Sequence, residues 1–136
     1  GLREHTVMVN SEQFVEFKGM LQERMNSLRE EIRRELLKSD NEHFIDLAGQ
    51  VHDLEESSVA DLLVDLNLAM LDQHIEEIRD IDAAMIRIMT GEYGVCIDCG
   101  CETESSRLRV VPTAKRCQSC QTVYERMHAE FIHSSL

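Results

Sequence analysis

Five cysteines lie between residues 96 and 120 of a 136-residue chain that has none elsewhere. Four of them form two C-x2-C pairs, Cys96 with Cys99 and Cys117 with Cys120, and 17 residues separate the pairs. Each C-x2-C turn presents two sulfurs to one ion at about 2.3 Å, so this spacing predicts a tetrahedral four-thiolate site with one structural zinc ion. Four protein thiolates leave no position for a catalytic water, so we expect no catalytic residue at this site.

Disulfides and thiol redox chemistry are the alternatives for the same cysteines. The chain contains no run of about 18 apolar residues and no signal-peptide pattern, so we expect a cytoplasmic protein, in which disulfides are disfavoured. A thioredoxin-like site needs a strand followed by a helix, and the surrounding sequence shows no such pattern. Cys101 is left over and is predicted to be a spare thiol, with an exchange between Cys101 and Cys99 left open.

The segment around the cysteines, residues 91–121, is too short to bury a core of its own. Bound zinc supplies the missing free energy in small modules of this kind. Gly94 and Gly100 permit tight turns beside the first cysteine pair, and Pro112 stiffens the approach to the second. We therefore predict a four-cysteine zinc finger over this segment.

A short C-terminal helix and a tail are expected after the zinc finger, in residues 122–136, with the helix over residues 122–132. Val123, Met127 and Phe131 recur at four-residue spacing, which is typical of one face of a helix. We expect this face to pack against the base of the helices that precede the zinc finger.

Two long amphipathic helices are predicted upstream. The first has apolar residues three or four apart with charged residues between them: Phe14, Phe17, Leu21, Met25, Leu28, Ile32 and Leu36. The second has a stripe that shifts by one residue midway: Val59, Leu63, Leu66 and Met70, then Leu71, Ile75, Ile78, Ile81, Met85 and Ile88. Residues 38–57 lack clean periodicity and are predicted to form the turn.

We therefore expect a mainly α fold, in which a long antiparallel two-helix coiled-coil hairpin over residues 11–90 precedes the zinc finger and the short C-terminal helix. Each helix is expected to be about 40–48 Å long, with an acidic tip near residues 40–58 at the end far from the cysteines. A compact helical bundle is the alternative, but a single chain offers no third long helix for it. We expect a monomer, and we expect residues 1–10 to be disordered or added to the natural chain.

Negative charge is concentrated before the cysteines. The net charge is −12, and residues 95–136 contribute nothing to it, with five basic and five acidic residues. Between Lys38 and Arg79 there are eleven acids and no Lys or Arg. Because proteins bind nucleic acid largely through Lys and Arg, this surface indicates a basic or metal-bearing partner, although a merely solvated acidic face is the simpler explanation.

The cysteine segment resembles the zinc-finger signature of the DksA/TraR family of bacterial transcription regulators. The matching residues are GEYGVCIDCG at 91–100, Arg107 with Leu108, Pro112, and CQSC at 117–120. The helical hairpin fits the longer, DksA-like branch. The resemblance implies a protein of the stringent response that binds bacterial RNA polymerase rather than DNA. Family members insert the coiled coil through the secondary channel and change the stability of promoter complexes.

The family carries an Asp-x-x-Asp-x-Ala motif at the tip of the coiled coil. An ungapped count back from Cys96 places Asp53 at the first acidic position, Glu56 at the second and Ser58 at the alanine. The resemblance implies that these residues contact the active centre of the polymerase. Glu56 and Ser58 both depart from the family pattern.

Some family members also bind guanosine tetraphosphate between themselves and the polymerase, through basic residues. The matching positions here are Asp80, Val111 and Gln121, none of them basic. Phosphate recognition needs Lys, Arg or converging backbone N–H groups, so we expect a weak or absent response to this alarmone.

Other function classes compete with the polymerase-binding regulator. A nucleic-acid-binding zinc ribbon predicts a basic surface with aromatic residues, whereas residues 95–136 have zero net charge and only Tyr124 and Phe131. A thiol or zinc-buffering protein predicts labile metal and a reactive Cys101. An enzyme is the least supported, although tip carboxylates that hold a metal promote transcript cleavage in other channel-binding factors.

Overall fold

The computed structural model describes residues 11–135, and the side chains of residues 12–129. The order of elements is α1 (Ser11–Leu37), α2 (Glu42–Gln50), η2 (Val51–Asp53), α3 (Glu56–Leu66), η3 (Ala69–Leu71), α4 (Asp72–Thr90), α5 (Ser105–Val110) and α6 (Gln118–Ser135), where η marks a 3-10 turn. The predictions for residues 1–10 and for the Phe131 side chain lie outside this description. Within residues 11–135, no helix is long and apolar enough to span a membrane.

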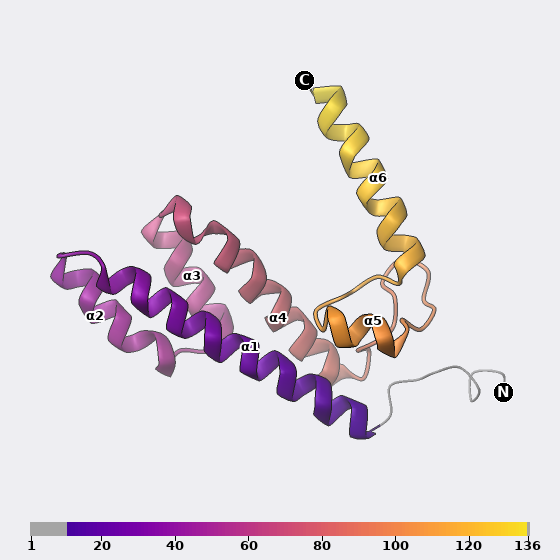
Figure 1. Cartoon of the computed structure of the whole chain (residues 1–136), viewed down its shortest axis with the longest axis horizontal. Helices are drawn as coiled ribbons and strands as arrows, with labels where there is room; N and C mark the ends of the chain where they lie inside the picture. Colours follow the sequence, from indigo (N-terminus) through magenta and orange to yellow (C-terminus); the bar gives the residue numbers. More distant parts are fainter. Residues whose placement is uncertain (1–10, 136) are drawn as a thin grey trace.

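Helices α1 and α4 form the antiparallel hairpin that the sequence predicts (Figure 1). Arg24 on α1 forms an ion pair with Glu77 on α4, and about two turns further along α1, Glu31 lies 3.2 Å from the Nε2 atom of His74. Residue numbers rise along α1 while those of its partners on α4 fall, so the two helices are antiparallel. The mainly α fold class, with its hairpin, four-cysteine module and C-terminal helix, is confirmed.

The second predicted helix is interrupted, and in this respect the prediction of one continuous helix over residues 59–88 is wrong. Helix α3 ends at Asn67, which adopts the left-handed conformation with φ 52° and donates its N–H to the carbonyls of Leu63 and Val64. Leu68 is extended, and α4 begins after the short turn η3. Asparagine tolerates the left-handed region better than most residues, which explains why the chain breaks here.

The predicted turn region contains a helix of its own. Helix α2 begins after Asn41, whose side chain accepts a hydrogen bond from the N–H of His43 at 2.8 Å. This Asn cap satisfies one free N–H of the first turn and fixes where the helix begins. Helices α2 and α3 consequently fold back along α1 and α4 instead of extending the hairpin.

The acidic turn therefore lies beside the middle of α1, whereas the rod predicted from the sequence places it at the far end. Arg29 of α1, only 8% exposed, donates hydrogen bonds of 2.5 Å to the carbonyls of Val51 and Leu54. It also forms an ion pair with Glu56 at 3.7 Å. Folding back gives the chain an interior that a two-helix rod lacks, because four helices instead of two surround the apolar stripes.

The hydrophobic core joins the stripes of all four helices. The first stripe is buried from Phe17 to Leu36, as its spacing predicts. The second half of the core comes from α2, α3, α4 and the turns between them. The large side chains that are fully buried in the core as a whole are Phe17, Leu21, Met25, Leu28, Ile32, Leu36, Val51, Leu63, Leu71, Ile78 and Ile81, together with Leu108 of α5.

Helix α6 points away from the other helices (Figure 1). It begins at Gln118, inside the second cysteine pair, and residues 122–129 are all exposed. Val123 is 51% exposed and Met127 64%. The prediction that this helix packs against the hairpin base is therefore wrong for the residues whose side chains are described.

Candidate metal centre

The first cysteine pair sits on a tight turn directly after α4. Gly91, with φ 79°, caps α4, and Gly94 and Gly100 also adopt positive φ, where a side chain would be strained. The N–H of Cys96 donates to the carbonyl of Cys101 at 2.7 Å, and the N–H of Gly100 donates to the carbonyl of Cys96 at 3.0 Å. These bonds close the turn so that Cys96 and Cys99 project to the same side.

The second pair lies at the beginning of α6, and two arginines fix its approach. Arg107 donates from Nε to the carbonyl of Arg116 at 3.1 Å and from Nη1 to Oε1 of Gln118 at 3.0 Å. Arg116 forms an ion pair with Asp98 at 2.7 Å, and its guanidinium lies 3.9 Å from the centre of the Tyr124 ring. Arg116 therefore connects the first cysteine turn with α6.

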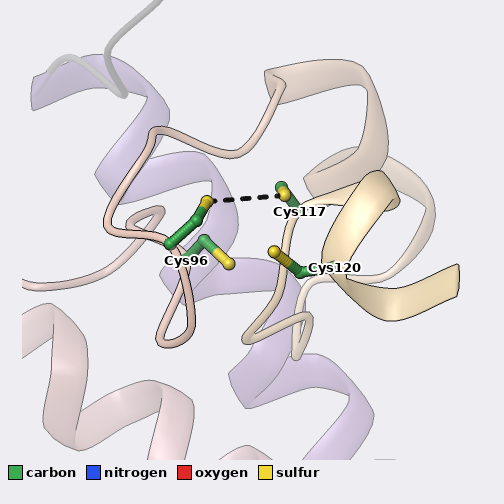
Figure 2. Close-up of side chains that lie close together, drawn as sticks. Cys96, Cys117 and Cys120 are labelled. Carbon is green, nitrogen blue, oxygen red and sulfur yellow. Dashed lines mark hydrogen bonds between the residues drawn. The ribbon is translucent and has the colours of Figure 1, made fainter. Parts of the chain in front are cut away.

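The four predicted ligands converge. The sulfurs of Cys96, Cys99, Cys117 and Cys120 all lie within 4.8 Å of one another, and Figure 2 shows the labelled Cys96, Cys117 and Cys120 turned toward one centre. The sulfurs of Cys99 and Cys117 are 3.8 Å apart. Four sulfurs at about 2.3 Å from one ion in a tetrahedron are about 3.8 Å apart, so the donor set and its spacing fit one zinc ion.

The thiols influence one another's ionisation. Burial alone would raise the pKa of Cys96, but hydrogen bonds to its sulfur from the backbone of Cys99, Cys117 and Asp98 lower the pKa to about 6. Hydrogen bonding with the sulfurs of Cys117 and Cys96 raises the pKa of Cys120. A bound divalent cation would favour the thiolate form of all four cysteines.

Cys101 stays outside the cluster. Its thiol is exposed and is absent from the group of converging sulfurs, while its carbonyl helps to close the first turn. The exchange with Cys99 that the sequence left open is therefore not needed in this arrangement. Cys101 remains a spare thiol.

A buried tyrosine attaches the zinc module to the hairpin. Tyr93, 3% exposed, donates from its hydroxyl to the carbonyl of Pro112 at 2.6 Å. Its ring packs against Phe14 and Phe17 of α1 at centroid distances of 6.2 and 5.8 Å. Burial raises the pKa of Tyr93 well above its usual value, so the phenol stays protonated and donates. The sequence offered no pattern that identified this role.

The three predicted tip residues lie together at the turn between α2 and α3. Asp53, in η2, and Ser58, in the first turn of α3, are exposed. Glu56 is partly buried by its ion pair with Arg29. Asp82 of α4 lies near Glu55 and Glu56, and its pKa is raised by burial and by these two carboxylates. Asp82 of α4 therefore adds a further carboxylate to those of the turn itself.

The positions matched to alarmone binding also lie together. Asp80, Val111 and Gln121 line a hollow of about 400 Å³ between α4 and the zinc module. Lys115 lies in the same hollow, near enough to oppose the rise that burial causes in the pKa of Asp80. The hollow therefore mixes both signs of charge.

Comparison with known proteins finds relatives that share these features. Residues 91–126 match the family model described as the prokaryotic dksA/traR C4-type zinc finger. The chain is 28% identical over 117 residues to the RNA polymerase-binding transcription factor DksA of Salmonella typhimurium, covering 86% of this chain and 74% of that protein. It is 27% identical to the protein of that name from Escherichia coli, with the same coverage.

A solved structure agrees on the fold. Transcription factor DksA2 from Pseudomonas aeruginosa superimposes with a TM-score of 0.61 at 22% identity, over 91% of this chain and 92% of that one. The C4 match and the four converging sulfurs confirm the predicted cofactor, one zinc ion. In its zinc finger, its helical hairpin and its sequence over most of its length, the chain is similar to DksA-like proteins of the DksA/TraR family.

Proposed function

We propose that this protein is a transcription regulator that binds bacterial RNA polymerase directly. The observation that carries the proposal is that similarity to proteins named RNA polymerase-binding transcription factors extends over 86% of the chain, through both the hairpin and the zinc module. Those relatives are named as transcription factors and not as enzymes. We propose accordingly that the protein works in the cytoplasm, as a monomer, and without catalysis of its own.

The charge distribution supports a protein partner rather than DNA. Residues 1–94 carry the whole net charge of −12, and residues 95–136, which include most of the zinc module and α6, carry none. Phosphate backbones are bound by Lys and Arg that release counterions, and this surface repels them. We propose that regulation occurs without sequence-specific DNA binding.

The acidic turn is the element that we propose to enter the polymerase. Asp53 is exposed there, and Glu55 beside it adds a second exposed carboxylate. In the secondary channel, the carboxylates of this turn would meet a cation-rich active centre, where a low dielectric strengthens each contact. Asp53, Glu56 and Ser58 would contact that centre and thereby modulate promoter complexes.

Alarmone sensitivity through the matched positions is proposed to be weak. Asp80 places a carboxylate in the hollow, and Val111 and Gln121 add no positive charge. Three basic residues, Arg107, Lys115 and Arg116, also line the hollow, but three acids, Glu76, Asp80 and Glu125, oppose them. A strong increase in the regulator's effect at low guanosine tetraphosphate concentration would show that the basic residues dominate instead.

The test is multi-round transcription in vitro from a ribosomal RNA promoter with bacterial RNA polymerase. We expect the wild type to change the transcript yield. We expect Asp53→Asn to bind polymerase but to leave the yield close to that of polymerase alone. Asp61→Asn is the matched control, because Asp61 is an exposed acid of α3 outside the tip. A wild type that neither alters transcription nor competes with a channel-binding factor for polymerase would overturn the proposal.

A further inference from the structure

The two interruptions of the hairpin lie at the same level of the α1/α4 pair. One is segment 38–41, between α1 and α2, and the other is segment 67–71, between α3 and α4. Lys38, the first residue of one segment, and His74, three residues after the other, line one hollow. Both segments lie at the end of the α1/α4 pair away from the zinc module (Figure 1). We call them the hinge segments.

Neither hinge segment prevents helix formation. Both lack proline and glycine, the residues that most strongly oppose a continuous helix. Ser39 and Asn41 in the first, and Asn67 in the second, are residues whose side chains support turns but also occur within helices. The break at Asn67 requires a positive φ in a residue with a side chain, a strain that a continuous helix would relieve.

The chain lengths on the two sides of the turn also match. Residues 38–53 and 54–71, sixteen and eighteen residues, connect the turn to α1 and to α4. If both became straight helices, they would prolong the α1/α4 pair by about 24–27 Å and bring Asp53 to its end.

Arg29 distinguishes the two forms. It contacts Val51, Leu54 and Glu56 in the form described here. Along a straight helix, residues 29 and 51 would be about 33 Å apart, so none of these contacts can exist in an extended hairpin. The nearby pair of Glu30 with His52, at 3.4 Å, is likewise confined to the folded-back form.

Because Arg29 is buried, its contacts with the turn between α2 and α3 matter for the stability of the folded-back form. A guanidinium that is 8% exposed requires partners, and two carbonyls and one carboxylate supply them here. When the turn moves away, Arg29 lies at the edge of the apolar stripe, where water can solvate it. Removing Arg29 therefore weakens the folded-back form and leaves the extended form largely unaffected.

We propose that the hairpin is a hinged device: it opens at the two hinge segments from the folded-back form into an extended hairpin, and Arg29 is the latch that keeps it folded back. Opening moves Asp53 from the side of α1 to the end of the molecule. The hinge motion stands on its own, whereas its use in reaching the polymerase active centre rests on the proposed function.

The test measures the distance between spin labels by double electron–electron resonance. Labels at exposed Asn26 and Glu55 are introduced as unnatural amino acids, because five cysteines preclude thiol labelling. We expect a short distance in the wild type, and in Arg29→Ala an increase of about tenfold or more in the population beyond roughly 35 Å. Arg33→Ala is the control, because Arg33 pairs with Glu30 within α1 in either form. A folded, zinc-loaded Arg29→Ala with the wild-type distribution would overturn the latch.

A second pair of variants tests the hinge itself. Asn67→Ala penalises the left-handed conformation and favours a helix, so it should increase the extended population several-fold, whereas Asn67→Gly should decrease it. Identical distributions in the two variants would refute a hinge at this position. Added polymerase should enrich the extended form. If the variants shift the distances but polymerase does not, the hinge stands and the proposed function fails.

Discussion

The helical bundle of α1–α4 and the zinc module are stabilised in different ways. Almost every large, fully buried side chain belongs to the bundle, where the apolar stripes of four helices meet. In the zinc module the buried apolar residues are few: Tyr93, Cys96, Leu108 and Ala114. The bundle therefore derives its stability from many small contributions of apolar burial, and the module from one metal ion. Damage should accordingly be gradual in the bundle and abrupt in the module.

The largest effect is expected from the loss of one zinc ligand. In Cys120→Ser the site loses one of its four thiolates, and structural zinc contributes on the order of 10 kcal/mol to modules of this size. We expect zinc content, measured by mass spectrometry of the metal, to fall sharply while the far-ultraviolet circular dichroism of the bundle persists. Cys101→Ser, outside the cluster, should keep full zinc content. Equal zinc loss in both variants would contradict the assignment of ligands.

A smaller effect is expected from a cavity in the bundle. Leu28 is 1% exposed, so Leu28→Ala should lower the free energy of unfolding by about 3 kcal/mol, measured by urea denaturation. Zinc content should be unchanged, since the bundle and not the module is damaged. Val15→Ala on the same helix, where Val15 is 73% exposed, should change stability by less than about 0.5 kcal/mol. Similar losses in both variants would mean that the α1 stripe is not the core face.

The contact between the two regions should have an intermediate effect. Tyr93→Phe removes the hydrogen bond to the Pro112 carbonyl and leaves a partly buried acceptor without its partner, at a cost of about 1–2 kcal/mol. We expect faster zinc release to a chelator together with a lower melting temperature. Tyr124→Phe is the control, because Tyr124 is exposed and its ring can still lie beneath Arg116. If only the melting temperature changes, Tyr93 supports the bundle without linking it to the module.

The smallest effect is expected from a surface ion pair of the bundle, and it should depend on pH. The hydrogen bond from Arg24 lowers the pKa of Glu77, so the pair stabilises the folded state above the usual carboxyl pKa and ceases to do so as pH falls through the lowered value. Because both side chains are more than a third exposed, Glu77→Gln should cost at most about 0.5 kcal/mol at pH 7. The difference from the wild type should shrink as pH falls below the usual carboxyl pKa and vanish once Glu77 is protonated in the folded state, as followed by thermal unfolding. A difference that grows toward acid would contradict this account.

The ligands of the metal centre could be predicted from sequence because their geometry is local. Two C-x2-C turns at a fixed separation constrain four sulfurs whatever surrounds them, and the structure brings the same four residues together. The buried face of α1 was also predictable, since the spacing from Phe17 to Leu36 defines one helical stripe. These features depend on residues near one another in the chain.

What the sequence did not reveal depends on long-range packing. Arg29 lies beside the stripe of α1 and shows no sign of burial until α2 and α3 fold against it. The break at Asn67 did leave a trace, because the second stripe shifts by one residue between Met70 and Leu71, immediately after the break. The orientation of α6 had no such signal, since an amphipathic pattern is the same whether its face is covered or not.

The folded-back arrangement also bears on how quickly the protein folds. Helix α1 meets α2 after only four residues and α3 meets α4 after five, so each pair is a hairpin of sequence neighbours. By contrast, the pairing of Arg24 with Glu77 closes a loop of more than fifty residues. Because nearby contacts form before distant ones, the two local hairpins should appear first and dock afterwards, on the microsecond to millisecond scale of helical proteins. An emerging chain can therefore cover the apolar face of α1 with α2 well before α4 has been synthesised.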